Sequence, residues 1–378
     1  MKRNAATIAV ALALFFAALG AQAQTDDRIQ IHGFGGWSYG RSTELSFLGA
    51  TKKGNADNAQ FALNLVAKPY ERLNIISQVN LKSTSDNEVD LDYAFAEWMA
   101  TDQVKLRVGR VKHPLGLYGE VYDVGTVRPF QYLPRSIYGE DGFTAKAYNG
   151  AGLTGLTRRG KWELLYDVYA GEIDGDYAIP YIPPGDVDLQ ASPFVNYGIR
   201  YRDVIGGRLQ VTTPVEGLLF GVSAYRGKEK FIGRTIVRDV DREVILGSAE
   251  YARGPVVVRA EWGRGDSKEL HIHEGGYVET SWRVTPKWQV AARYDTLTWD
   301  PVGFSSALDP YKLTDHRDVA LGLNYWLNSN FVLRANYHIT EGNRFAYPAT
   351  NQDLQAAIAA GTLESDTSAL IVGAQFSF

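Results

Sequence analysis

Few side chains in the sequence have types and spacing that could support chemistry. His271 and His273 alternate and precede Glu274; alternate residues of a strand point to one side, so the pair could hold a metal ion. A solvated loop is the simpler interpretation, and we expect no metal. Residues 150–155, GAGLTG, match a dinucleotide-binding pattern, but no helix follows them. We expect these glycines to allow close packing and to bind no cofactor.

Composition excludes several classes of protein. The chain has no cysteine, so disulfides, cysteine-ligated zinc and thiol catalysis are absent. A net charge of −4 gives no indication of a nucleic-acid partner. No catalytic set stands out, and we expect a protein that is not an enzyme.

In segments where apolar and polar residues alternate, charged residues recur at every second position. The bases that we expect to line a lumen are Lys105, Arg107, Arg200, Arg202, Arg259, Arg293 and Arg334. Acidic residues share this phase in similar number, so the count alone predicts no charge selectivity, although opposite walls could create a transverse field. The alternative is that these charges only solvate the lumen and pair across strands.

Alternation of apolar and polar residues runs along most of the chain and predicts β-strands. Val89, Leu91, Tyr93 and Phe95, for example, share one phase. The strands that we expect are 28–39, 58–68, 72–82, 88–100, 103–111, 146–157, 161–171, 194–212, 217–227, 243–252, 255–264, 274–284, 287–298, 316–327, 330–341 and 366–378.

The connections between these segments distinguish a barrel from a soluble sandwich. Tight turns such as 68–71 and 158–161 alternate with longer loops such as 40–57 and 342–365. An even number of strands with alternating short and long links is typical of outer-membrane barrels. We therefore expect an all-β fold, a 16-stranded antiparallel transmembrane β-barrel with short periplasmic turns and long extracellular loops, over residues 24–378.

The first residues resemble an export signal. Lys2 and Arg3 precede an apolar run over 5–19, and Ala21 and Ala23 form a small-x-small cleavage site. The run is short for a membrane anchor, so we expect residues 1–23 to be a signal peptide.

The longest loop, residues 112–145, differs from a flexible surface loop. It contains Pro114, Pro129, Pro134 and many aromatic residues, which favour a fixed, packed path. We expect it to fold into the lumen, where the constriction would be formed by Lys112, His113, Arg128, Arg135, Glu140 and Asp141. The alternative is an ordered extracellular cap.

Three stretches carry a resemblance to a known family. Residues 106–138 contain VGRVKHPLGLY, residues 206–225 read GGRLQVTTPVEGLLFGVSAY, and residues 248–254 read SAEYARG. They resemble Gram-negative outer-membrane porins, loosely related to the phosphate-selective-porin-like superfamily. The resemblance implies a 16-stranded porin in the cell outer membrane, narrowed by its third loop and often trimeric, with Phe378 similar to a barrel-assembly signal. Phosphate-selective members have a strongly basic lumen, whereas the inward charges here are balanced.

We therefore expect a water-filled channel for passive diffusion of small hydrophilic solutes or ions. Its other partners would be outer-membrane lipid and lipopolysaccharide, with assembly as a homotrimer. The alternative is a structural or adhesive barrel with an occluded lumen.

Overall fold

The computed structural model describes residues 28–56, 58–83, 88–138, 143, 146–179, 195–232, 237–302, 311–348 and 351–378. The segment expected to be a signal peptide, 1–23, lies outside these ranges. Among the described residues, no helix is long and apolar enough to cross a membrane. The helical segments are short: η1 Gly119–Val121, η2 Gly125–Val127, α2 Arg135–Tyr138 and α3 Asn351–Ala360.

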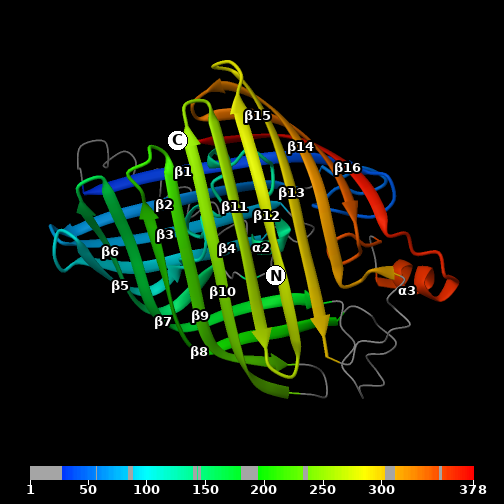
Figure 1. Ribbon diagram of the computed structural model, residues 1–378, viewed down its shortest axis with the longest axis horizontal. Helices are drawn as coiled ribbons and strands as arrows, with labels where there is room; N and C mark the ends of the chain where they lie inside the picture. Colours follow the sequence, from blue (N-terminus) through cyan, green and yellow to red (C-terminus); the bar gives the residue numbers. More distant parts are fainter. Residues whose placement is uncertain are drawn as a thin grey trace, which may run out of the picture.

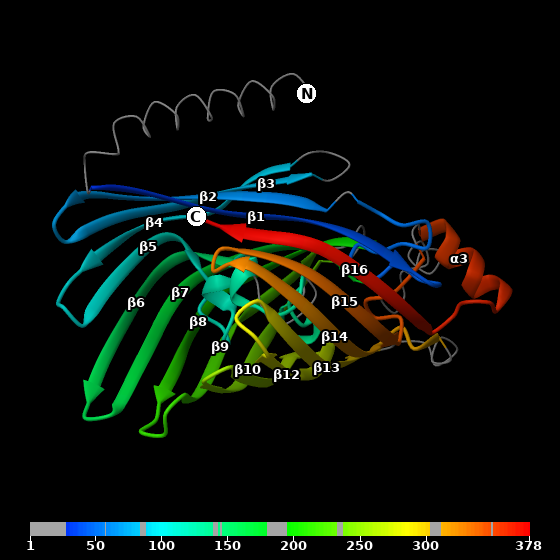
Figure 2. The same cartoon turned by 90° about the horizontal axis from the view of Figure 1, so that it is seen from above.

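Sixteen antiparallel strands form one closed barrel, which confirms the predicted fold class (Figure 1). Each strand pairs with its sequence neighbours, and β1 pairs with β16. The strands are β1 Ile29–Ser42, β2 Ala59–Tyr70, β3 Leu73–Ser83, β4 Glu88–Met99, β5 Val104–Lys112, β6 Ala147–Arg159, β7 Trp162–Ile179, β8 Val195–Thr212, β9 Leu218–Ile232, β10 Val237–Arg253, β11 Val256–Ser267, β12 His271–Arg283, β13 Trp288–Pro301, β14 Asp315–Asn328, β15 Phe331–Glu341 and β16 Asp366–Ser377. Helix α3 lies beyond the strand ends (Figure 2).

The two faces of the wall differ as a membrane barrel requires. Large apolar side chains are exposed on the outside, among them Trp37, Trp162, Phe220, Trp262, Trp282, Leu321, Leu333 and Leu370. Polar side chains face the interior, among them Ser38, Glu97, Asp167, Ser223, Glu261, Asn324, Asn336 and Gln375. Closure between β1 and β16 leaves no unpaired strand edge. The backbone N–H and C=O groups of the wall are therefore hydrogen-bonded within the protein, as a bilayer requires.

A β-bulge changes the phase of β4. Gln78 pairs with Tyr93 and Val79 pairs with Leu91, so Asp92 is an extra residue. Leu91 is exposed on the outside, whereas Phe95 is buried and lies under the guanidinium of Arg107. The prediction that Tyr93 and Phe95 face outward with Leu91 is therefore wrong. The extra residue of a bulge turns the side chains that follow it to the opposite face, and the spacing of apolar residues in the sequence does not reveal this.

The glycines of residues 150–155 allow close strand packing, as the sequence indicated. Gly150 pairs with Gly171 across β6 and β7, and a Cβ on Gly150 would lie 2.7 Å from the Gly171 Cα and would also meet the Ala170 carbonyl. These neighbours are backbone atoms, so they cannot move aside cheaply.

We expect Gly150→Ala to destabilise the barrel by roughly 1–3 kcal/mol through overpacking. The measurement is the temperature at which the folded band converts to the unfolded band in SDS electrophoresis. Gly247→Ala is the control, because a Cβ there has its nearest neighbour at 4.0 Å. Equal transition temperatures for the two variants would contradict the packing role of Gly150.

Candidate pore constriction

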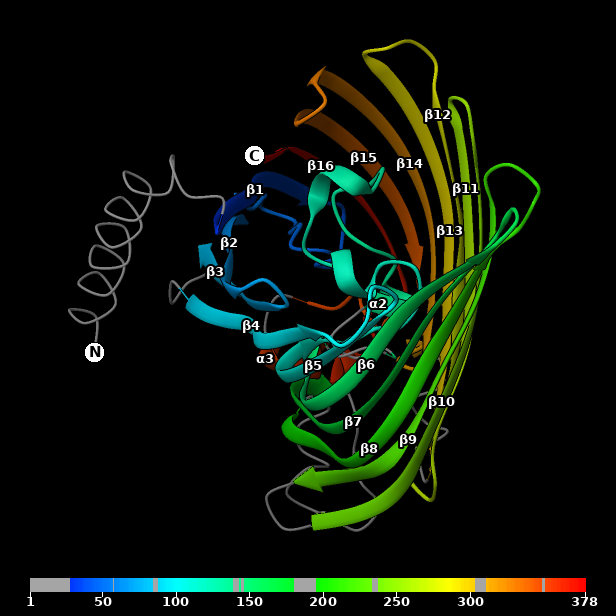
Figure 3. The same cartoon turned by 90° about the vertical axis from the view of Figure 1, so that its left-hand side faces the viewer.

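The connection between β5 and β6, residues 113–146, is loop 3, and its described part lies inside the barrel (Figure 3). Its backbone amides donate to inward side chains of the far wall. Gly116 N donates to Ser223 Oγ of β9 at 3.1 Å, and Leu117 N donates to Glu261 Oε1 of β11 at 2.9 Å. The structure therefore shows loop 3 in the lumen, not as an extracellular cap.

The later part of loop 3 follows the wall onward toward β16. Gln131 N donates to Asn336 Oδ1 of β15 at 2.8 Å. The amide of Arg135, at the start of α2, donates to Asp295 Oδ2 of β13 at 2.7 Å. The described backbone of loop 3 has no neighbouring strand to pair with. Its amides instead donate hydrogen bonds to inward-pointing side chains that are spread over half of the barrel wall.

Glu261 accepts hydrogen bonds both from loop 3 and from the wall. Its carboxylate accepts bonds from Leu117 N at 2.9 Å, Ser248 Oγ at 2.6 Å, Tyr277 Oη at 2.7 Å and Tyr138 Oη. Only 3% of the residue is exposed. Since two donors come from loop 3 and two from strands, Glu261 joins the loop to the wall.

Two of the predicted lumen arginines lie beneath loop 3. Arg334 donates to the carbonyl oxygens of Phe130 at 3.2 Å, Gly125 at 2.9 Å and Arg128. Arg293 donates to Tyr132 O at 2.9 Å and stacks on the Phe130 ring at 4.6 Å.

Both side chains face inward, as expected, but Arg293 and Arg334 are each only 3% exposed. The loop covers them. They therefore anchor loop 3 and do not present a charge to the open lumen.

Three other predicted residues face the interior and are paired. Lys105 Nζ lies 3.0 Å from Glu97 Oε1, and Arg107 Nε lies 2.9 Å from Glu97 Oε2. Arg259 Nε lies 2.6 Å from Glu250 Oε2, and its NH1 donates to Tyr118 Oη at 2.8 Å.

Loop 3 contributes its own acid to this part of the wall. Glu120 bridges Arg107 at 3.1 Å and Arg208 at 2.6 Å. Burial opposes ionisation of Glu120, but the two guanidinium groups outweigh it and lower its pKa. This acid therefore stays charged and offsets the bases beside it.

Arg200 and Arg202 do not line the lumen, and this prediction is wrong. A bulge in β8 places an extra residue between the pairs Arg202–Lys228 and Ile205–Arg226, and Asp203 has a φ of 52°. Upstream of the bulge it is Tyr201 that turns inward, beneath Arg242 at 5.0 Å.

Arg202 instead pairs with Asp239, and both side chains are more than a third exposed on the outer surface. Arg200 lies two residues before Arg202 in the same strand and is also exposed. The outer wall above the apolar band is thus charged.

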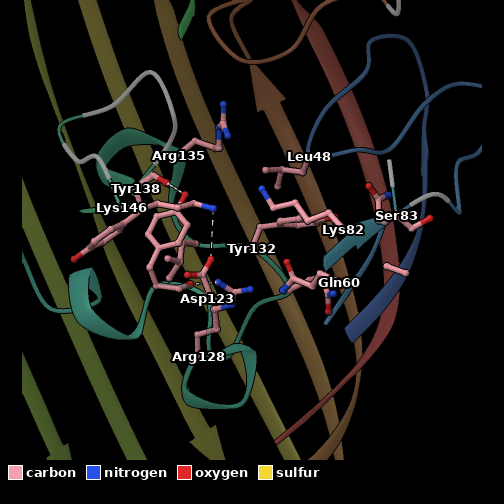
Figure 4. Close-up of a pocket in the computed structure, with 15 residues that line it drawn as sticks. Leu48, Gln60, Lys82, Ser83, Asp123, Arg128, Tyr132, Arg135, Tyr138 and Lys146 are labelled. Carbon is pink, nitrogen blue, oxygen red and sulfur yellow. Dashed lines mark hydrogen bonds and ion pairs between the residues drawn. The ribbon is translucent and has the colours of Figure 1, made fainter. Parts of the chain in front are cut away.

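A cavity of about 250 Å³ remains between loop 3 and the ends of β2 and β3 (Figure 4). Its lining residues are Leu48, Asn58, Ala59, Gln60, Lys82, Ser83, Tyr122, Asp123, Arg128, Gln131, Tyr132, Leu133, Arg135, Tyr138 and Lys146. Among the described residues of this lining, Lys82, Arg128, Arg135 and Lys146 carry positive charge and Asp123 carries negative charge.

Asp123 is already neutralised. Lys112 Nζ lies 2.6 Å from its Oδ2, and Lys146 Nζ lies 3.6 Å from its Oδ1. Burial opposes ionisation, but these two lysines hold the pKa of Asp123 well below its usual range. The cavity is therefore lined by an excess of positive charge, with Lys82 and Gln60 facing the loop residues across the opening in Figure 4.

The six residues predicted for the constriction divide into four groups. Arg128 and Arg135 line the cavity, and Lys112 lies behind it against Asp123. His113 does not face it, because its ring is buried and its Nε2 lies 2.6 Å from Tyr169 Oη. Glu140 and Asp141 lie outside the described residues.

Sequence reasoning missed Lys82 and Lys146. Lys82 lies next to the last residue of β3, and Lys146 lies just before β6. Both are strand-end lysines, so they could not be separated from ordinary rim charges by sequence pattern.

The histidine pair does not form a three-ligand site. His271 contacts Glu229 at 3.4 Å and His273 contacts Arg242 at 3.4 Å, both inside the barrel, whereas Glu274 pairs with Arg264 on the outside. Within the described ranges no three His, Cys, Asp or Glu side chains come together as metal ligands.

Residues 36–40, GWSYG, match the GxSxG nucleophile pattern, a match that sequence reasoning missed. That pattern needs a sharp strand-to-helix turn, whereas Ser38 lies inside β1 and its hydroxyl lies 3.2 Å from Tyr132 Oη. The structural context of the motif is therefore missing here.

Comparison with known proteins places the barrel among known folds. Residues 228–378 match the family model described as phosphate-selective porin O and P, and this match covers less than half of the chain. No curated protein matches it significantly.

Several solved outer-membrane barrels share the fold of this chain at low identity. OmpT of Vibrio cholerae superposes with a TM-score of 0.57 at 12% identity, covering 94% of this chain and 99% of that one. The channel DcaP of Acinetobacter baumannii gives 0.56 at 9% identity, covering 93% and 97%. An anion-selective porin from Comamonas acidovorans gives 0.54 at 12% identity, covering 93% and 99%. At such identities the likeness shows the fold alone.

Proposed function

We propose that the porin is a passive diffusion channel that favours small anions and that loop 3 forms its constriction. The observation that carries this proposal is the cavity beside loop 3, where Lys82, Arg128, Arg135 and Lys146 outnumber Asp123. Loop 3 covers much of the inward charge on the far wall, so the charges that a solute meets are not the balanced set of the whole interior.

The descriptions of similar proteins agree with this direction. One structural neighbour is titled an anion-selective porin, and the matching family model is named for phosphate selectivity. A V. cholerae OmpT structure is described as a trimer form, which supports a homotrimer here. The charged outer wall near Arg202 is suited to the polar headgroups of outer-membrane lipid and lipopolysaccharide.

The test is the reversal potential of the refolded porin in a planar bilayer under a KCl gradient. A charge about 6 Å from a passing ion in water changes its energy by about 0.7 kcal/mol, or roughly threefold in permeability. We expect the wild type to favour chloride. We expect Lys82→Gln combined with Arg128→Gln to lower the chloride-to-potassium permeability ratio several-fold.

Arg202→Gln is the control, because it removes one positive charge from the outer face. It is expected to leave the ratio unchanged. A wild type that favours potassium would contradict anion preference, and a folded barrel without current would favour the structural or adhesive alternative.

A further inference from the structure

The cavity beside loop 3 contains buried hydrogen-bonding atoms without partners. In the part of the chain that the structure describes, Asn58 Nδ2, Arg128 Nε and Gln131 Oε1 are buried and make no hydrogen bond. Arg128 and Gln131 are 8% and 5% exposed, and all three residues line the cavity. Native proteins rarely leave such atoms unsatisfied, so the polar side chains around the cavity are not fully paired within the described part of the chain.

The charge of the cavity lining determines whether it would bind an anion or a cation. The guanidinium of Arg128 donates to a backbone carbonyl, Tyr122 O, at 3.0 Å and has no carboxylate partner among the described residues. Burial lowers the pKa of Arg128, and a bound anion would offset that effect. Lys82 likewise has no ion pair within the described ranges. A bound anion would provide Arg128 and Lys82 with an ion-pair partner.

Part of the remaining wall is apolar, beside the polar side chains of Asn58, Gln60, Ser83 and Gln131. Leu48, from the connection between β1 and β2, and Leu133 of loop 3 line the cavity together with the rings of Tyr122 and Tyr132. A volume of about 250 Å³ is many times what one water needs and exceeds what a tetrahedral oxoanion fills. Inorganic phosphate would contact the cations but leave the leucine and tyrosine surfaces exposed to water.

We propose that this cavity is a saturable binding site for small organic acids whose carboxylate is attached to an aromatic or other apolar body. The carboxylate would lie against Arg128 and Lys82, and the apolar body would contact Leu48, Leu133 and the tyrosine rings. The inference rests on the proposed anion-favouring channel and adds a substrate class to it.

The test compares sodium benzoate, sodium acetate and sodium phosphate as blockers of the chloride current through single channels of the full-length porin. Burial of roughly 50 Å² of ring surface is enough for about a tenfold gain in affinity. We expect benzoate to reduce the current with a saturable concentration dependence. Its half-effect concentration should lie about tenfold below that of acetate, with phosphate no stronger than acetate.

Leu48→Asn provides a second readout, since Leu48 has a φ of 50° and asparagine tolerates that conformation. It is expected to remove the advantage of benzoate over acetate. Val121→Asn is the matched control, because Val121 is in loop 3 but does not line the cavity.

The outcomes separate this proposal from the channel function. Equal half-effect concentrations for benzoate and acetate, or a stronger effect of phosphate, would overturn the organic-acid site while anion preference stands. A current that falls without saturating would show that no binding site exists. A chloride preference that is absent from the reversal potential itself would instead contradict the proposed function.

Discussion

Removal of residues 120–138 is expected to raise the single-channel conductance of the barrel roughly twofold or more. This segment contains most of η1, all of η2 and α2, and it occupies the lumen of a barrel that is wide enough for an aqueous channel without it. The strands pair only with one another, so the wall should close in its absence. The measurement is single-channel current in symmetrical KCl, after a folded band is verified by electrophoresis.

Deletion of residues 351–360 is the control, because it removes α3 from beyond the strand ends. That variant should conduct like the wild type. If the loop 3 deletion gave a folded barrel of unchanged conductance, loop 3 would not be the constriction.

Replacement of Glu261 by alanine is the second change with a large expected effect. It leaves Leu117 N, Tyr138 Oη and Tyr277 Oη without their acceptor at buried positions. Each orphaned donor costs about 1–3 kcal/mol, so part of loop 3 should detach from the wall. We expect frequent current fluctuations and a lower thermal transition of the folded band.

Glu250→Ala is the matched control for that variant. Glu250 lies on the neighbouring strand β10, and the ion pair it makes there is with Arg259, in a more exposed position. Single channels of Glu261→Ala that are as quiet and as heat-stable as those of Glu250→Ala would contradict the anchoring role.

The strands could be predicted because each one alternates and each must cross the same apolar band. All sixteen expected segments overlap an observed strand, including the pair that closes the barrel. The side chains that face inward were predictable only as far as the alternation is unbroken. The bulges at Asp92 and Asp203 reverse the alternation. The residue type gives no sign of them, because an aspartate could equally mark the end of a strand.

The accessibility of inward residues could not be predicted at all. Arg293 and Arg334 have the right phase, but their exposure depends on the path of a loop distant in the sequence. The cavity likewise combines Lys82 of β3 with Arg128 of loop 3, and no local pattern relates the two. The path of loop 3 depends on tertiary contacts such as those of Glu261.

The position of the cavity at one side of the barrel has a consequence for how this protein can evolve. Residues beneath loop 3, such as Arg334 and Glu261, are constrained by folding because changes there release the loop. Gln60 and Lys82 border the passage and are not among these anchors of loop 3. Related barrels could therefore exchange one cargo for another through substitutions at a few positions on β2 and β3, while the rest of the interior is retained.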